Sequence, residues 1–378
     1  MNDFQAVSLD ILKEFSRVAA SENIEWCVMF GTLLGAVRSN GFIPWDTDID
    51  VALPRSSYEK LKKLTHLFKE PYFLQTIDND PAAALRIMKL RRSDTAFISV
   101  FPDSMTIGGN MGIYMDIIPL DEVPDAKTAR SLQHTTQLIR RQMLASAGLD
   151  ECRGDVPPFK EEICFADGGV AGLYPLFAQR HEDMLLRHMG ERYYAMPVLS
   201  GERGSRVYQK EWFSDTVMMQ FEDIEVPVPS GYREVLVASF PEGLYEAKPE
   251  KDMKENRIID SKRSYKEYVS IYADMLAGIS GKKVYLFGAG DSLRIWMERY
   301  GKYVNVVCTF DNAEEKWGTT AYGVTVRNPD ELPNIITKED RLIITSIYHK
   351  EISKQLRDLG ISDFYIFIDG YYYSFEGR

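Results

Sequence analysis

Cysteine is scarce in this chain of 378 residues, with four present at Cys27, Cys152, Cys164 and Cys308. No two of them form a Cys-x-x-Cys pair, so a disulfide framework or a zinc ribbon is not expected. Adding His181 and His188 gives spacings of 12, 17 and 7 positions, which match no compact zinc template. We therefore expect ordinary buried thiols in place of a structural zinc.

Long apolar runs are also missing, since none approaches the roughly 20 residues needed to span a bilayer. The first residues, MNDFQAVSLD, lack the basic and then apolar pattern of a secretion signal. Positive charge is in short supply, because 45 Lys and Arg face 56 Asp and Glu, for a net charge of −11. Such acidity argues against a broad nucleic-acid-binding face. The sequence predicts a cytoplasmic protein with no transmembrane segment and no nucleic-acid partner, and it leaves metal-mediated phosphate chemistry open.

Apolar material is plentiful, at 45% hydrophobic residues, and the length indicates two or three domains. Residues 281–378 hold 13 basic and 14 acidic residues, so nearly all of the negative excess lies in the first 280. Residues 246–267 are almost all charged or polar, which is typical of a connector or a surface helix. We predict a domain over 1–275 and a second domain over 281–378.

Apolar periodicity predicts the elements of the first domain. Phe4, Ile11, Phe15 and Val18 recur at helical spacing, which predicts an N-terminal helix. Further helices are predicted over 56–68, 126–146 and 178–189. Strands are predicted over 26–30, 49–53, 72–75, 85–90, 96–101, 113–118 and 221–228. Because the strands come with few intervening helices, an α+β domain is favoured over a doubly wound sheet.

Three carboxylates stand in apolar surroundings. Asp48 and Asp50 are separated by one residue on a predicted strand, so both side chains should leave the same face, with Cβ atoms about 7 Å apart. Two divalent ions roughly 4 Å apart would fit that space. Asp116 lies within the apolar run GIYMDIIP, where an unpaired carboxylate costs several kcal/mol. The three acids predict a shared Mg²⁺ or Mn²⁺ site.

A glycine-containing turn precedes these acids. Gly31 and Thr32 follow a predicted strand and offer backbone N–H groups to a phosphate before the next helix begins. Arg38 lies on that helix, where it would either balance the charge of a leaving phosphate or form an ion pair. A Gly-Thr turn at a strand end, two acids on the next strand and a third acid on another strand together indicate the nucleotidyltransferase fold.

The stretch GTLLGAVRSNGFIPWDTDIDVALPRSSYEKL resembles the LicD family, which includes bacterial phosphocholine transferases and eukaryotic fukutin-type ribitol-phosphate transferases. The runs KLRRSDT (89–95), MDIIPLD (115–121) and FEDIEVPVPSGYREVL (221–236) are similar to later motifs of that family, so the resemblance covers roughly residues 20–240. The chain departs at Thr47, where the family often has a third Asp, and at Ser239-Phe240, where it usually has Tyr-Gly. The second departure bears on recognition of the acceptor or of the donor's tail.

The resemblance implies Mg²⁺-dependent transfer of a phospho-alcohol from a CDP-linked donor to a hydroxyl of a cell-surface glycan, such as lipopolysaccharide or teichoic acid, or of its precursor. Phosphocholine from CDP-choline is the favoured group. Glycerol phosphate, ribitol phosphate and phosphoethanolamine are alternatives. Two further alternatives are a nucleotidyltransferase that makes the activated donor and a non-catalytic scaffold of polysaccharide assembly.

The resemblance also implies roles for individual residues. Asp48, Asp50 and Asp116 would hold the ions, and Asp116 would accept the proton of the incoming hydroxyl. Phosphate binding would fall to five residues, namely Gly31, Thr32, Arg38, Lys89 and Arg91. Because Lys89 and Arg91 alternate on a strand, a merely solvated face is the other interpretation for them.

Two residues between the glycine turn and the acids have open roles. Asp46 would either cap a turn or support the metal ligands. A quaternary ammonium such as choline needs an aromatic face, and Trp26, Trp45 and Tyr114 lie near the motifs. Trp45 is a candidate for that contact, with ordinary packing as the alternative.

The second domain contains KKVYLFGAGDSLRIW (282–296), which predicts a strand, a glycine turn and a helix. The next predicted strand, 304–310, ends at Asp311, about 20 residues after the turn, as in dinucleotide-binding βαβ units. Leu293 replaces the third glycine of that fingerprint, so the evidence for a nucleotide is weak. The segment resembles Rossmann-like modules of polysaccharide-assembly proteins. A small α/β domain for docking or homo-oligomerisation is slightly favoured over a nucleotide site.

Overall fold

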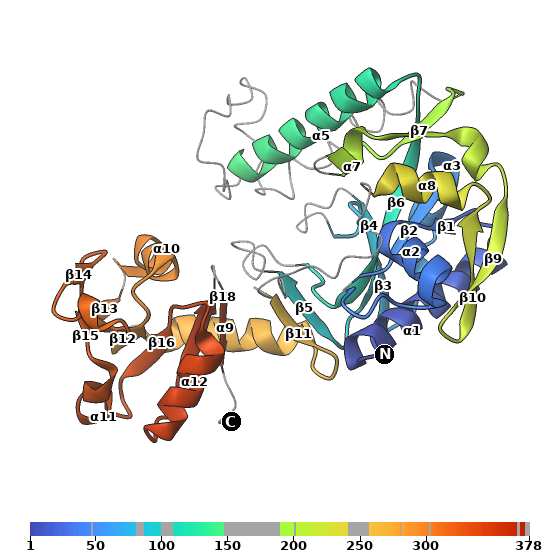
Figure 1. Cartoon of the computed structure of the whole chain (residues 1–378). Helices are drawn as coiled ribbons and strands as arrows, with labels where there is room; N and C mark the ends of the chain where they lie inside the picture. Colours follow the sequence, from blue (N-terminus) through green and yellow to red (C-terminus); the bar gives the residue numbers. More distant parts are fainter. Residues whose placement is uncertain are drawn as a thin grey trace. The chain divides into compact units, whose positions relative to one another are not determined.

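The computed structural model describes residues 1–46, 48–80, 87–99, 109–146, 190–199, 202–240, 257–279, 281–301, 304–368 and 371–374. The chain divides into two compact units (Figure 1). The first comprises Met1–Phe97, Gly108–Met253 and Ile259–Arg263, and the second Ile98–Ile107, Lys254–Ile258 and Ser264–Arg378. Helix α9 (Tyr265–Ile279) belongs to the second unit, whereas the sequence prediction assigned most of it to the first domain. Within the described ranges, no helix is long and apolar enough to cross a membrane.

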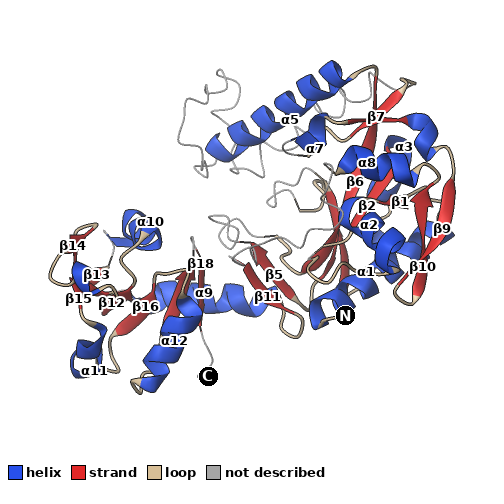
Figure 2. Ribbon diagram, in the orientation of Figure 1, coloured by secondary structure: helices blue, strands red, loops and turns tan. Residues whose placement is uncertain are grey.

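The first unit is built on a mixed sheet (Figure 2) with the strand order β1-β2-β6-β4-β3. The strands are β1 (Cys27–Val28), β2 (Asp50–Pro54), β3 (Tyr72–Gln75), β4 (Met88–Arg92) and β6 (Ile113–Val123). Strands β2 and β6 are parallel, and the other pairs in this order are antiparallel. The short strands β7 (Tyr193–Ala195) and β8 (Val207–Gln209) continue from β6. A mixed α and β architecture was expected here, and the nucleotidyltransferase fold itself stays a prediction.

Six helices and one small strand pair complete the described part of this unit. The helices are α1 (Asp3–Ser21), α2 (Phe30–Ser39), α3 (Arg55–Lys62), α5 (Ala126–Ser146), α7 (Glu202–Ser205) and α8 (Tyr232–Ser239). Short 3₁₀ turns lie at η1 (Thr65–Leu67) and η3 (Lys210–Phe213). The strand pair is β9 (Thr216–Phe221) with β10 (Ile224–Pro229). The strands β5 (Ala96–Ser99) and β11 (Arg257–Asp260) also pair, and each of them has residues in both units. The helix predicted over 178–189 lies outside the described residues.

The N-terminal helix follows from local sequence signals. The Asn2 side chain accepts a hydrogen bond from the Gln5 amide (2.8 Å), and the Gln5 side chain accepts one from the Asn2 amide (3.1 Å), which forms a capping box. Ile11, Phe15 and Val18 of the predicted stripe are buried. The apolar stripe therefore packs α1 into the core of the first unit, as the spacing predicts.

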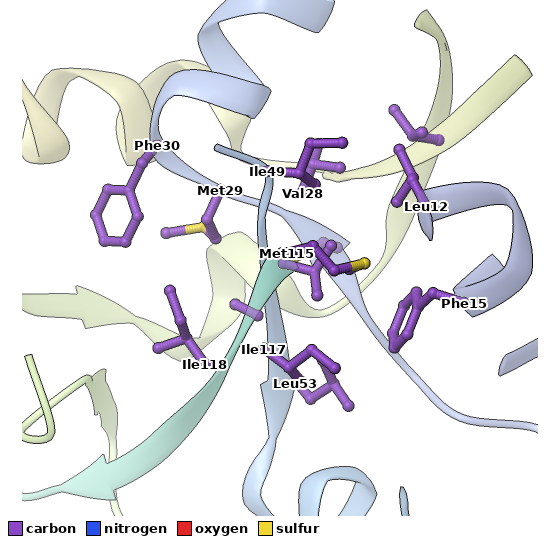
Figure 3. Packing of buried hydrophobic residues seen from close by; sticks show 14 of the residues in the cluster. Leu12, Phe15, Val28, Met29, Phe30, Ile49, Leu53, Met115, Ile117 and Ile118 are labelled. Atoms are coloured by element: carbon purple, nitrogen blue, oxygen red, sulfur yellow. The ribbon is translucent and has the colours of Figure 1, made fainter. Parts of the chain in front are cut away.

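The core determines which face of the sheet is left for chemistry. Figure 3 shows Met115 and Ile117 of β6 among the buried side chains, together with Leu12 and Phe15 of α1 and Leu53 of β2. Each buried aliphatic or aromatic side chain contributes about 1.5–3 kcal/mol. Because side chains alternate along a strand, Tyr114 and Asp116 point to the face opposite Met115 and Ile117, and both are only half-buried. Ile118, further along the face of Asp116, is buried, so only the first part of β6, with the predicted ligand Asp116, is left partly open on that face.

The second unit is a mostly parallel sheet with the order β14-β15-β13-β12-β16-β17-β18. Its parallel strands are β12 (Lys283–Phe287), β13 (Asn305–Phe310), β15 (Val324–Arg327), β16 (Arg341–Ile344) and β17 (Tyr365–Ile368). Strands β14 (Thr320–Ala321) and β18 (Tyr371–Ser374) pair antiparallel at the edges. The order of the five parallel strands, third-second-first-fourth-fifth, is that of a doubly wound sheet, so the predicted α/β class is confirmed.

Helices connect these strands in the second unit. They are α10 (Asp291–Tyr300), α11 (Leu332–Ile335) and α12 (His349–Asp358), with 3₁₀ turns η5 (Glu314–Lys316) and η6 (Pro329–Glu331). Gly288 connects β12 to the glycine turn with φ at +116°, and a Cβ there would lie 2.5 Å from the carbonyl oxygen of Thr345. This position therefore requires glycine for both its conformation and its close backbone approach.

Candidate metal centre

Three carboxylates meet where β2 and β6 lie side by side. Asp50, the first residue of β2, is in register with Asp116 of β6, and Asp48 lies two positions earlier. One carboxylate oxygen from each residue lies within 4.8 Å of the others. Two oxygens bound to one Mg²⁺ or Ca²⁺ at 2.0–2.6 Å are at most about 5 Å apart, so the spacing suits a shared ion. The structure thus brings the three predicted acids together.

The position of Asp48 differs from the expected one. The sequence placed both acids on one strand, but in the structure the ladder with β6 begins at Asp50 and Asp48 precedes it. Asp48 therefore approaches from the segment leading into the sheet, and alternation along a strand does not set its direction. The carboxylates converge all the same.

Backbone hydrogen bonds fix the two acids on the strands. The Asp50 amide donates to the Thr32 hydroxyl (2.9 Å), and the Asp50 carbonyl accepts from the Met29 amide (3.0 Å). The Asp116 amide donates to the Ile49 carbonyl (2.8 Å). Thr32 was predicted to offer its backbone N–H to a phosphate, and its buried hydroxyl accepts the hydrogen bond of the Asp50 amide. The hydroxyl therefore helps to position Asp50, one of the predicted metal ligands.

Gly31 lies in the first turn of α2, which begins one residue earlier at Phe30. The strand predicted over 26–30 is shorter, because Phe30 has φ at +48° and turns the chain directly into the helix. A Cβ at Gly31 would lie 2.2 Å from Oδ2 of Asp46, so the Asp46 carboxylate packs against this glycine. A side-chain hydrogen bond, in which one of the two carboxyl groups carries the proton, joins Asp46 to the predicted metal ligand Asp48.

Burial and neighbouring carboxyl groups of the cluster raise the pKa values of Asp48 and Asp50. Burial raises the pKa of Asp50 well above its usual value, and the charges of Asp48, Asp116 and Asp46 raise it further. Burial and then the charge of Asp116 raise the pKa of Asp48, against the lowering effect of the Asp46 hydrogen bond and of Lys89 and Arg203. Oxygen donors that are closely spaced and short of positive charge are what Mg²⁺ or Mn²⁺ prefers. The residues present therefore fit a divalent ion.

Lys89 is the cation on the Asp116 side. It pairs with Asp116 in register across β4 and β6, and its ammonium forms an ion pair with Oδ1 of Asp116. The same ammonium lies 3.5 Å from the centre of the Tyr114 ring. Lys89 is thus held beside the carboxylates, as predicted for a charge-balancing residue of the site.

Arg91 and Arg38 have other surroundings. Arg91 is buried, and its guanidinium donates to the Gly112 carbonyl (2.7 Å) and to the Gln75 side chain. Arg38 lies in the last turn of α2, seven residues from Gly31, or about 10 Å along the helix axis. Its guanidinium carbon lies 6.0 Å from the centre of the Trp45 ring. The contacts of Arg91 with Gly112 and Gln75 thus lie within the sheet region, and that of Arg38 lies at Trp45.

The three aromatic candidates for a choline contact differ in access. Trp26 packs edge-on against Phe15 at 5.1 Å in the core, and Tyr114 is covered by Lys89 and lies edge-on to Phe97 at 4.9 Å. Trp45 is 38% exposed. Of the three rings, Trp45 is the one left open to a ligand.

The sequence did not identify Arg203, which lies more than 150 positions after Asp48 on the four-residue helix α7. It lowers the pKa of both Asp48 and Asp50, and its guanidinium carbon lies 5.1 Å from the centre of the Phe30 ring. No spacing or motif relates this residue to the acids. Only the fold brings it to them.

The cysteines agree with the expectation of free thiols in the part that can be described. Cys27 and Cys308 are free and buried, and burial raises the pKa of Cys27 to about 12 and that of Cys308 to about 11. The residues considered for a structural zinc all lie outside the described residues, namely Cys152, Cys164, His181 and His188. Thr47 also lies outside them.

In the second unit, Asp311 is fully engaged. Its carboxylate accepts hydrogen bonds from the amides of Ala289 (2.8 Å) and Ala313 (3.0 Å) and lies 3.2 Å from the Lys316 ammonium. Ala289 belongs to the glycine turn. The acid predicted to follow the turn at dinucleotide-binding spacing therefore ties that turn to the next loop.

Two segments match known families. Residues 23–111 match the family described as LicD/FKTN/FKRP, nucleotidyltransferase domain. Residues 280–367 match the family described as C2185-like, N-terminal. The first match contains Asp48 and Asp50, and it includes Gly31, Thr32 and Lys89.

Individual relatives agree with the first match. The chain is 25% identical to the lipopolysaccharide cholinephosphotransferase LicD of Haemophilus influenzae over 269 residues, which are 68% of this chain and 96% of that protein. Uncharacterized proteins of Rickettsia typhi and Rickettsia prowazekii are 31% and 33% identical over 71 and 67 residues, 18% of this chain and about a quarter of theirs. A solved UDP-D-quinovosamine 4-dehydrogenase from Vibrio fischeri gives 18% identity and a TM-score of 0.22, covering 25% of this chain and 93% of that one. A likeness that low carries no argument.

Proposed function

Since the chain carries a LicD family domain, we propose that it transfers a phospho-alcohol from a CDP-linked donor to a hydroxyl of a cell-surface glycan or its precursor. Phosphocholine from CDP-choline is the favoured group, the reaction depends on Mg²⁺ or Mn²⁺, and the fold is that of a nucleotidyltransferase. One observation carries the proposal. Within this domain and its continuation on β6, three acids that repel one another converge to within 4.8 Å.

Asp48, Asp50 and Asp116 would hold the divalent ion, with Asp46 supporting Asp48 through its hydrogen bond. Such an ion, when bound, neutralises the charge that develops on the departing CMP. Oδ1 of Asp116 pairs with Lys89, which leaves Oδ2 for the ion, and the same carboxylate would accept the proton of the attacking glycan hydroxyl. Lys89 holds that carboxylate in place throughout.

The geometry narrows the predicted phosphate contacts. The amide groups of the first turn of α2, around Gly31, present the positive end of the helix beside Asp46 and Asp48. Thr32 and Arg91 serve the scaffold through their buried hydrogen bonds. Among the five residues predicted for phosphate, we therefore assign direct contact to Gly31, while Lys89 balances charge through its ion pair with Asp116.

Two observations at Trp45 favour different donor alcohols. Trp45 offers the exposed ring that a choline ammonium requires. However, the Arg38 guanidinium already lies 6.0 Å from that ring, and two cations on one ring repel each other. This contact favours an uncharged alcohol, such as glycerol or ribitol, as the second candidate.

A donor panel tests the proposal. The full-length protein is incubated with Mg²⁺, one CDP-alcohol at a time and lipopolysaccharide or teichoic acid oligosaccharides, and CMP and the modified glycan are measured. We expect CMP in equal amount to product, and loss of both in Asp48→Asn. Asp223→Asn is the matched control, because Asp223 is an exposed acid of the same unit that pairs with Lys13. Absence of CMP with every donor would contradict the proposal, and pyrophosphate release from CTP with a phospho-alcohol would instead indicate an enzyme that makes the donor.

Trp45→Ala separates the two donor alternatives. If the ring binds choline, the KM for CDP-choline rises by about threefold to thirtyfold, the range of a cation–π contact of 0.5–2 kcal/mol, while the KM for CDP-glycerol stays unchanged. An equal change for both donors would assign Trp45 to packing.

The cellular setting follows from the same proposal. We place the reaction in the cytoplasm, where CDP-linked donors are made, and assign the second unit to docking on a second copy or on an assembly partner. The internal engagement of Asp311 supports docking over nucleotide binding.

A further inference from the structure

Among the described residues, the cations Lys89 and Arg203 act on the carboxylate cluster, and they come from different parts of the fold. Lys89 stands on β4, and Arg203 on α7. Lys89 is already committed, since its ammonium forms an ion pair with Asp116 and lies over the Tyr114 ring. Arg203 forms no salt bridge with any residue that the structure describes, and its side chain is exposed. The two cations therefore differ in whether they remain available to a ligand.

The backbone that carries Arg203 is firmly packed. A Cβ at the next residue, Gly204, would lie 2.2 Å from the Leu199 carbonyl oxygen and 2.4 Å from Nε2 of Gln133. Arg206, three residues on, donates a hydrogen bond to the Ser239 carbonyl at 2.6 Å. The exposed side chain of Arg203 is thus mounted on a segment that has little room to move.

The Arg203 guanidinium lies near the carboxylate cluster. Its central carbon lies 5.1 Å from the ring centre of Phe30, a buried residue that opens α2. The residue before Phe30 donates its amide to the Asp50 carbonyl. Arg203 also lowers the pKa of Asp48 and Asp50. The contact with Phe30 and the influence on these two acids together place the Arg203 guanidinium beside the part of the cluster that Asp48 and Asp50 form.

We propose that Arg203 binds the phosphates of the donor from the side of Asp48 and Asp50, as the ligand-binding cation that complements the metal. This inference rests on the proposed function for its choice of ligand, a nucleoside diphosphate. A guanidinium offers two parallel N–H groups to two phosphate oxygens, and its planar face stays stacked on Phe30 while it does so. Arg203 then orients the diphosphate between itself and the carboxylates.

Removal of the Arg203 charge should weaken nucleotide binding without weakening metal binding. Isothermal titration of the full-length protein with Mn²⁺ alone, and with CDP in the presence of Mn²⁺, measures both. In Arg203→Gln we expect CDP to bind about tenfold to a hundredfold more weakly, the range of a lost charge-assisted hydrogen bond. We expect Mn²⁺ alone to bind as tightly as in the wild type or more tightly, because a cation beside the carboxylates is removed. Arg203→Lys, which keeps the charge, should recover part of the CDP affinity.

Arg233→Gln is the matched control, since Arg233 is an exposed arginine of the same unit stacked at 5.7 Å on Tyr232. We expect it to bind CDP like the wild type. The proposal is overturned if Arg203→Gln binds CDP within twofold of the wild type, if it loses Mn²⁺ and CDP together, or if the wild type binds no CDP. Should the wild type bind CDP with Mn²⁺ but release no CMP from any donor, the proposed function fails while the role of Arg203 in binding a nucleoside diphosphate stands.

Discussion

Asp50 in the first unit and Asp311 in the second both stand at the end of a sheet strand beside a glycine-containing turn. The carboxylate of Asp311 is satisfied by two amides and the Lys316 ammonium. Asp50 is buried among other acids, and both burial and their charges raise its pKa. Asp311 is thus surrounded by hydrogen-bond donors and a cation, whereas Asp50 is surrounded by other carboxyl groups. The contacts of Asp311 stabilise its own loop, and the repulsion around Asp50 would be relieved by a bound cation.

The two glycines beside these acids are required for different reasons. Gly31 is required because the Asp46 carboxylate packs against it beside the metal ligands. Gly288 is required because its backbone packs against Thr345 within the sheet. A glycine in a turn after a strand therefore indicates that another group lies close to its backbone. A carboxylate near the glycine indicates a functional site, and a backbone carbonyl indicates a structural contact.

The largest contrast is expected from removing each acid. Asp50→Asn should lower the transferase rate by at least about a hundredfold, since a metal ligand supports several kcal/mol of charge stabilisation. The same variant should raise the free energy of unfolding of the metal-free protein, because it removes a buried charge. Asp311→Asn should leave the rate unchanged and lower stability by about 1 kcal/mol through loss of its ion pair.

Urea unfolding without divalent ions and CMP release with Mg²⁺ measure the two quantities. If Asp50→Asn destabilises the metal-free protein as Asp311→Asn does, then Asp50 is a structural acid and the contrast between the units disappears.

A smaller contrast is expected from two threonines. Thr32→Val leaves the buried amide of Asp50 without a partner, which should lower stability by about 1–3 kcal/mol and reduce kcat about tenfold by loosening Asp50. Thr345→Val removes hydroxyl contacts to the Phe287 and Gly288 carbonyls, which also accept the Thr345 amide and the Thr309 hydroxyl. Its effect should stay below about 1 kcal/mol, with kcat unchanged. Steady-state kinetics and thermal unfolding of both variants check this, and an unchanged kcat in Thr32→Val would show that its hydroxyl does not position the site.

Much of this contrast was visible in the sequence, because it depends on local patterns. An acid inside the apolar run of β6 predicted Asp116 as a ligand, and Asp116 is observed half-buried on the face opposite its buried neighbours Met115 and Ile117. The spacing from the glycine turn to Asp311 predicted a βαβ unit, which the strand order of the second unit confirms.

The rest could not be predicted, because it depends on contacts distant in sequence. Arg203 has no motif, and it reaches the acids only because α7 packs beside Phe30. The contact between the Thr32 hydroxyl and the Asp50 amide joins two residues that are 18 positions apart, and no local pattern indicates it. The contact between Arg38 and Trp45 likewise depends on how the chain returns after α2.

The smallest contrast is in the response to acid. Asp48 and Asp50 have raised pKa values in the fold, so the folded first unit takes up protons before the unfolded chain and gains stability as the pH falls from 7.5 to 5.5. Burial lowers the pKa of His349 to about 4, so in the second unit the unfolded chain takes up the proton first and stability falls, by about 1 kcal/mol over the same range. Amide hydrogen exchange without divalent ions, corrected for intrinsic rates, reports each unit separately.

Saturating Mg²⁺ provides the internal control for that measurement. Ligands must lose their protons to bind the ion, so with Mg²⁺ the first unit should lose stability on acidification, while the second unit keeps its response. Movement of both units in the same direction without metal would remove the electrostatic difference between them.

Mn²⁺ binding to the metal-free full-length protein, followed by electron paramagnetic resonance at pH 7.5, tests the central claim most directly. The account predicts that the wild type and Asp311→Asn bind Mn²⁺ alike and that Asp50→Asn loses the site. Equal binding by all three proteins would show that the convergent acids of the first unit are not a metal centre.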